Sequence, residues 1–141
     1  MTNDVEGRPA VSYRVAVKQD LIAQHYLIGK APESEKQRHS HRYEVEVQLE
    51  GSPLNDQGYL VDIDDVKRHL NELLGAYQDK TLNDLPEFRD LNPSIEHLAR
   101  VLCTALSGRL KLPNIEAMTI RVWENANAWA LCRQDLSCGS V

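Results

Sequence analysis

The chain has 141 residues, of which 42% are hydrophobic and 26% charged, a balance typical of one globular domain. Lys and Arg number 16 against 21 Asp and Glu, the net charge is −5 and no basic run is present, so we expect no nucleic-acid partner. No apolar run approaches the roughly 20 residues of a membrane span and the N-terminus lacks a signal pattern, so no membrane association is expected. The cysteines Cys103, Cys132 and Cys138 share no CxxC spacing, which indicates a reducing compartment and a cytoplasmic protein.

The first part of the chain predicts two strands joined by a loop. We expect residues 1–11 to form a flexible tail. Apolar residues alternate with polar or small ones over residues 12–18, which indicates a half-buried strand, and the apolar content continues to residue 28. A loop with Gly and Pro follows at residues 29–38. Apolar and charged side chains then alternate over residues 39–51, the clearest strand in the sequence.

Two helices are predicted next, from apolar residues at helical spacing. The first apolar stripe runs over residues 63–77 and the second over residues 95–106. The Asn-Pro-Ser at residues 92–94 suits the start of the second helix, and Gly108 suits its end. The polar segment over residues 78–92 predicts a loop between the helices.

Two strands complete the chain, over residues 117–123 and 128–133, with a hairpin turn at residues 124–127. The element order is therefore β-β-α-α-β-β. This order favours an α+β fold in which two helices cover one face of a four-stranded antiparallel sheet. We expect one domain over residues 12–135 and a short tail at residues 136–141.

The histidines form the most informative pattern. His39 and His41 are two residues apart, so on a strand both side chains project from the same face. His25 comes opposite this pair if the first two strands form a hairpin. Three neutral imidazoles suit Zn²⁺ and leave one coordination position open, which predicts a catalytic metal site. The alternative is ordinary strand histidines without a metal; His69 and His97, on the predicted helices, have no ligand spacing.

Several short segments resemble motifs of the 6-pyruvoyl-tetrahydropterin synthase / 6-carboxytetrahydropterin synthase family. That family typically carries A-x-H-x-L, H-G-H, G-M-V-x-D-F-x-x-L-K, D-H-x-x-L-N-D, P-T-x-E-N-L-A and V-x-E-T. The corresponding segments here are residues 23–27 (AQHYL), 39–41 (HSH), 58–67 (GYLVDIDDVK), 82–84 (LND), 93–99 (PSIEHLA) and 122–125 (VWEN). No single motif is specific, but the ordered set is.

The resemblance implies a tunnelling fold (T-fold), in which subunits join their sheets into a barrel, commonly as a homohexamer of two trimers. It also implies Zn²⁺ held by His25, His39 and His41, and a pterin substrate, 7,8-dihydroneopterin triphosphate. In that family zinc polarises the substrate's side-chain hydroxyls, a cysteine thiolate removes a proton and an Asp-His pair moves protons.

Three residues match the family's pterin anchors. Glu124 matches the main anchor, and an ionised carboxylate can accept both parallel N–H donors of the pterin edge. Glu96 and Ser94 match a second anchoring motif. The alternative for Glu96 is stabilisation of the first helical turn, and for Glu124 a solvated hairpin position.

The proton-transfer residues depart from the family pattern. Residues 29–38 contain no cysteine, so Glu33 and Glu35 are the candidate bases there, with solvated loop charges as the alternative. Gln78 and Asp79 stand where the Asp-His pair belongs, which leaves Asp79 as the acid available for proton transfer.

Three functions follow as hypotheses. The first is a zinc-dependent lyase that forms 6-carboxytetrahydropterin from 7,8-dihydroneopterin triphosphate, for deazaguanine (queuosine) synthesis. The second is a glutamate-dependent cleavage of the side chain to 6-hydroxymethyl-dihydropterin for folate synthesis. The third is a non-catalytic oligomer that binds a pterin or purine.

Overall fold

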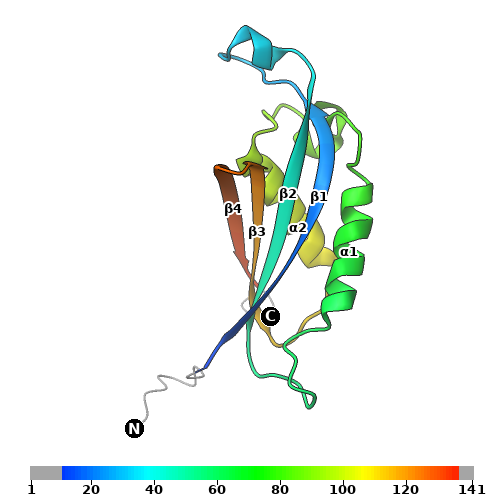
Figure 1. Ribbon diagram of the computed structural model, residues 1–141, viewed down its shortest axis with the longest axis vertical. Helices are drawn as coiled ribbons and strands as arrows, with labels where there is room; N and C mark the ends of the chain where they lie inside the picture. The colour runs from blue at the N-terminus through cyan, green and yellow to red at the C-terminus, as the bar shows by residue number, and fades with distance from the viewer. Residues whose placement is uncertain (1–10, 137–141) are drawn as a thin grey trace.

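The structure is a computed structural model that describes residues 11–136 (Figure 1). Within them, four antiparallel strands form one sheet in the order β1-β2-β3-β4. The order β-β-α-α-β-β and the antiparallel sheet predicted from the sequence are confirmed. The elements are β1 (Tyr13–His25), η2 (Glu33–Lys36), β2 (His39–Gly51), α1 (Ile63–Gly75), η3 (Leu82–Asp84), η4 (Pro86–Phe88), α2 (Ile95–Arg109), β3 (Ile115–Asn125) and β4 (Ala128–Asp135), where η denotes a 3-10 helix.

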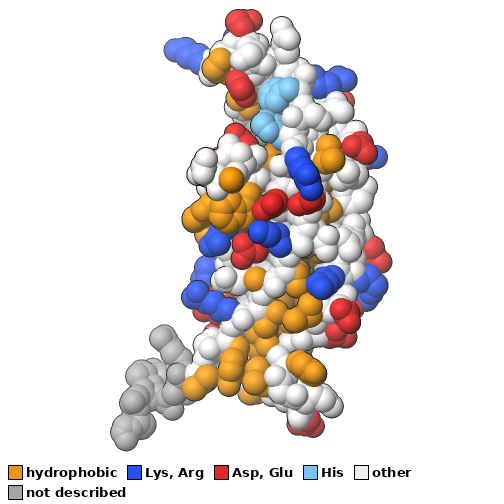
Figure 2. Space-filling view, in the orientation of Figure 1, with side chains coloured by type: hydrophobic (Ala, Val, Ile, Leu, Met, Phe, Trp, Pro, Cys, Tyr) orange, Lys and Arg blue, Asp and Glu red, His pale blue; other side chains and the backbone are white. Residues whose placement is uncertain are grey.

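The sheet has an apolar face and a charged face because side chains alternate along each strand. On the apolar face the cross-strand neighbours Val17, Val47 and Ile120 form one buried row. α1 packs against β1 while α2 packs against β3 and β4, so both helices cover this face. The other face carries ion pairs such as Lys18–Glu44 at 3.2 Å, and Figure 2 shows basic and acidic side chains interleaved across the middle of the sheet.

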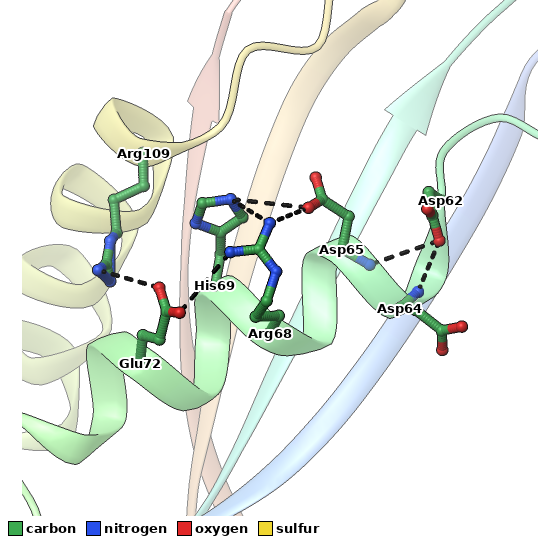
Figure 3. A network of polar contacts seen from close by, with 7 residues as sticks. All are labelled: Asp62, Asp64, Asp65, Arg68, His69, Glu72 and Arg109. Atoms are coloured by element: carbon green, nitrogen blue, oxygen red, sulfur yellow. Dashed lines mark hydrogen bonds and ion pairs between the residues drawn. The ribbon is translucent and has the colours of Figure 1, made fainter.

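Ion pairs lie along the exposed side of α1, and one of them reaches α2 (Figure 3). The N-cap carboxylate of Asp62 accepts hydrogen bonds from two backbone amides of the first turn. Arg68 lies between Asp65 and Glu72, and Glu72 also meets Arg109 of α2 at 3.5 Å. These charges are solvent-exposed, so each pair contributes little to stability. No helix within residues 11–136 combines the length and apolar character that crossing a membrane requires.

Several element boundaries differ from those predicted. β1 continues well past Lys18, because it pairs with β2 along its whole length. α2 passes through Gly108 because the chain leaves the helix at Leu110 in an extended conformation, which needs no left-handed glycine. β3 continues to Asn125, so the hairpin turn comprises residues 126–127 rather than four residues.

The connection between the helices is more ordered than the predicted loop, since it contains η3 and η4 and lies along the outer edge of β1. The amide of Asp79 donates to the carbonyl of Ile22 at 2.7 Å, and the amide of Gln24 donates to that of Lys80 at 2.9 Å. These bonds cover the end of β1. The outer edge of β1 along its first half and the outer edge of β4 have no strand partner among the described residues.

Candidate metal centre and substrate site

Three histidines meet at one end of the sheet, on the face that the helices cover. β1 ends at His25 and β2 begins at His39, and these two residues are direct cross-strand partners. His41 lies opposite Ala23, on the same face. One ring nitrogen from each of the three histidines lies within 4.8 Å of the others. The hairpin predicted through residues 29–38 therefore brings His25 against the His-x-His pair. We call these three residues the His trio.

Hydrogen bonds to the backbone determine which nitrogens face the centre of the trio. Nδ1 of His25 lies 3.0 Å from the carbonyl oxygen of Pro93, and Nδ1 of His39 lies 2.7 Å from that of Gln37. A carbonyl oxygen only accepts, so each Nδ1 carries the hydrogen and each Nε2 keeps a lone pair. Both Nε2 atoms are buried and have no hydrogen-bond partner among the described residues. Histidines that donate one ring N–H to a backbone carbonyl and keep the other nitrogen free are typical ligands of metal sites.

The electrostatics favour a neutral imidazole at His25. Burial lowers the pKa of His25 below its ordinary value, and the neighbouring His41 and His39 lower it further, whereas the hydrogen bond to Pro93 and the charge of Glu124 act in the opposite direction. A neutral imidazole is the form that binds a metal. The trio thus fits a divalent metal with three nitrogen ligands and one position open to a substrate.

One of the two glutamates predicted as a base lies beside the trio, and the other does not. Oε1 of Glu35 is 3.7 Å from Nε2 of His39, the nitrogen that faces the metal position. The segment is anchored because the amide of Leu27 donates to the carbonyl of Glu35 at 2.8 Å. Glu33 pairs instead with Lys36 at 3.5 Å, and its side chain is 89% exposed.

Glu124 also lies near the trio. It belongs to β3 and is half-buried, so the interpretation as a solvated hairpin residue is wrong. Its charge raises the pKa of His25, and it adds to the burial that raises the pKa of Tyr43. A carboxylate, two histidine lone pairs and an open metal position therefore share one end of the apolar face.

The remaining predicted residues have other local contacts. Oγ of Ser94 caps α2 by accepting from the amide of His97 at 3.1 Å. Glu96 is exposed in the first turn of that helix, where a negative charge is favourable. Asp79 is held through its backbone at the edge of β1. Within residues 11–136 neither carboxylate bonds to the trio.

Sequence reasoning missed two residues that support the site. Asn83 pairs with the backbone of Tyr26, directly after His25: Oδ1 accepts from the amide and Nδ2 donates to the carbonyl, both at 3.0 Å. Tyr43 continues the alternation of His39 and His41 along β2 and reaches Nδ1 of His25. The Leu-Asn-Asp motif was the sequence signal for Asn83. The two-residue spacing after His41, which places Tyr43 on the same face, was the signal for Tyr43.

Comparison with known proteins places the chain in a family. A curated protein of Archaeoglobus fulgidus, provisionally named a 6-carboxy-5,6,7,8-tetrahydropterin synthase, is 28% identical over 96 residues, which cover 68% of this chain and 76% of that protein. A Plasmodium vivax 6-pyruvoyltetrahydropterin synthase, solved as a catalytic-residue variant with a glutamate changed to alanine, has a TM-score of 0.76 at 13% identity and covers 89% of this chain and 99% of its own.

A Caenorhabditis elegans 6-pyruvoyl tetrahydropterin synthase has a TM-score of 0.72 at 17% identity, and the alignment covers 89% of this chain and 97% of that one. At these identities the structural neighbours show the fold alone, and they confirm the T-fold predicted from the sequence. The family model described as 6-pyruvoyl tetrahydropterin synthase matches residues 14–135, and the chain therefore belongs to the 6-pyruvoyl tetrahydropterin synthase family.

Proposed function

We propose that this protein is a zinc-dependent pterin lyase that acts on 7,8-dihydroneopterin triphosphate, with Glu35 as the proton-abstracting base, and forms 6-carboxytetrahydropterin for deazaguanine (queuosine) synthesis. The observation that carries the proposal is the Glu35 carboxylate, 3.7 Å from the metal-facing nitrogen of His39. Glu35 occupies the region in which the family keeps its cysteine base. The choice of product is supported by the name of the Archaeoglobus fulgidus relative.

Each group in the site has a distinct task. His25, His39 and His41 would hold the metal, which when bound supplies Lewis-acid polarisation of the substrate's side-chain hydroxyls. Glu124 accepts the two N–H donors of the pterin edge, because a carboxylate offers two parallel acceptor oxygens. Oε1 of Glu35 takes a proton from the side chain of the bound substrate. Since its side chain is 44% exposed, Glu35 can return that proton to water.

The test compares Glu35→Gln with Glu33→Gln. The first change keeps the shape of the side chain but removes the base, so kcat should fall about 10²–10⁴-fold, the usual contribution of a general base. Glu33→Gln is the matched control on the same 3-10 helix and should leave kcat within about twofold. Zinc-loaded protein is incubated with 7,8-dihydroneopterin triphosphate, and products are identified by mass spectrometry. Equal rates for wild type and Glu35→Gln would refute the assigned base.

A second function is favoured by the glutamate itself. The catalytic-residue variant of the Plasmodium vivax synthase has alanine in place of a glutamate, and here too a glutamate stands where the usual cysteine is missing. Cleavage of the side chain to 6-hydroxymethyl-dihydropterin would use the same metal, base and pterin anchor. The same assay distinguishes the two functions by the mass of the product. Absence of turnover, with pterin binding lost in Glu124→Ala, would instead indicate a non-catalytic pterin-binding protein.

We also propose that the chain forms a homo-oligomer, a hexamer of two trimers. The outer edge of β1 along its first half and the outer edge of β4 lack strand partners among the described residues, and open edges readily pair with another sheet. Trp129 and Leu131 on the edge strand β4 are 47% and 41% exposed, so two large apolar side chains are available for burial in an interface between subunits. A monomer by light scattering at micromolar concentration would contradict this assembly.

A further inference from the structure

Tyr43 is a fully buried side chain whose hydroxyl lies against the His trio. A buried hydroxyl without a partner is costly, so the position of its oxygen is informative. Among residues 11–136 the hydroxyl has one hydrogen-bond partner, Nδ1 of His25 at 3.3 Å. The two rings meet edge to face, with centroids 6.3 Å apart and an interplanar angle of 79°.

The direction of this hydrogen bond follows from the other partner of His25. Because the carbonyl of Pro93 can only accept, Nδ1 already carries its hydrogen. The oxygen of Tyr43 is therefore a second acceptor for the same N–H, at 3.3 Å against 3.0 Å for Pro93. Two acceptors on one N–H hold the imidazole from two sides and keep the lone pair of Nε2 directed at the metal position.

His25 is the most firmly held member of the trio. It is 4% exposed, and its Nδ1 is bonded to groups from two other parts of the fold. Nδ1 of His39 is held by Gln37, only two residues away in the same segment. His41 has no hydrogen bond from its ring to any described residue. Among the described residues, His25 is therefore the histidine of the trio whose ring is held by hydrogen bonds from distant segments of the chain.

We propose that Tyr43 is a positioning residue that fixes the ring orientation of His25 and thereby raises the affinity of the trio for zinc. This role rests on the proposed metal-dependent function. Tyr43 would act by holding the ligand His25 and would not itself bind the metal. Hydrogen bonds to metal-binding histidines typically change metal affinity by about 10–100-fold when they are removed.

The test is the zinc affinity of Tyr43→Phe, measured without substrate by competition with a chromogenic chelator. This change deletes one oxygen and leaves the ring in the core, so the fold is retained and far-UV circular dichroism verifies it. We expect zinc to bind about 10–100-fold more weakly. Tyr77→Phe is the matched control, because Tyr77 is also buried and its hydroxyl donates to Glu87 at 2.7 Å. Its zinc affinity should equal that of wild type.

The outcomes separate the positioning role from a general effect on stability and from the proposed function. Equal zinc affinity in wild type and Tyr43→Phe would overturn the positioning role and leave the metal-dependent function intact. Wild-type protein that binds no zinc would overturn both. A decrease of zinc affinity in Tyr43→Phe that Tyr77→Phe shows equally would reveal only lost stability, and would also refute the role.

Discussion

Asn83 offers a test of how the end of β1 is held beside the His trio. Its side-chain amide makes two hydrogen bonds of 3.0 Å to the backbone of Tyr26, the residue after His25. Asn83→Leu keeps a similar volume and removes both bonds. At about 1 kcal/mol for each lost bond, with both backbone groups only partly buried, the free energy of unfolding should fall by about 2 kcal/mol.

The measurement is urea unfolding of metal-free protein at one fixed protein concentration, because assembly would make stability depend on concentration. Asn127→Ala is the control, since Asn127 is exposed in the β3–β4 turn and a surface change of this kind should cost no more than about 0.5 kcal/mol. Zinc affinity should also fall in Asn83→Leu, because the change removes both hydrogen bonds that hold the backbone of Tyr26, the residue directly after His25. An unfolding free energy of Asn83→Leu within about 0.5 kcal/mol of wild type would refute a stabilising role for the two Asn83 hydrogen bonds.

Three further predictions concern the metal, a close backbone contact and the thiols. Zinc at about 100 times its Kd should raise the unfolding free energy by about 2.7 kcal/mol over protein in chelator, and His39→Ala should abolish the difference. Gly51→Ala should cost about 1–3 kcal/mol in thermal unfolding, because a Cβ there would lie 2.1 Å from a backbone carbonyl oxygen, whereas Gly75→Ala meets nothing within 4 Å and should show no such loss. Burial raises the pKa of the Cys103 thiol to about 12, so iodoacetamide at pH 8 should modify half-buried Cys132 faster than Cys103. Labelling of both at an equal rate in the folded protein, measured by peptide mass mapping, would contradict this.

Local patterns were sufficient to predict the four strands and the two α-helices, but not the 3-10 helices between them. The alternation over residues 39–51 matches β2 residue for residue, because a strand with one buried face must repeat every two residues. The stripe over residues 63–77 predicted α1 for the same kind of reason. Boundaries were less accurate where tertiary pairing extends an element, as it does for β1 and β3.

The histidine spacing also predicted much of the candidate metal site. Two-residue periodicity places His39 and His41 on one face of β2. When β1 and β2 pair as a hairpin, His25 lies directly opposite His39 on that same face. The order of short motifs was enough to identify the family, which the family model over residues 14–135 confirms.

What the tertiary structure decided is how these residues are held. His25 contacts Pro93 across 68 residues of chain, and Tyr26 contacts Asn83 across 57. No local pattern could therefore reveal which ring nitrogen faces the centre of the His trio or what the Leu-Asn-Asp motif does. Which of Glu33 and Glu35 lies beside the His trio likewise depends on the turn of one short 3-10 helix. Periodicity specifies the face on which a side chain lies, whereas hydrogen bonds between distant segments specify where its atoms point.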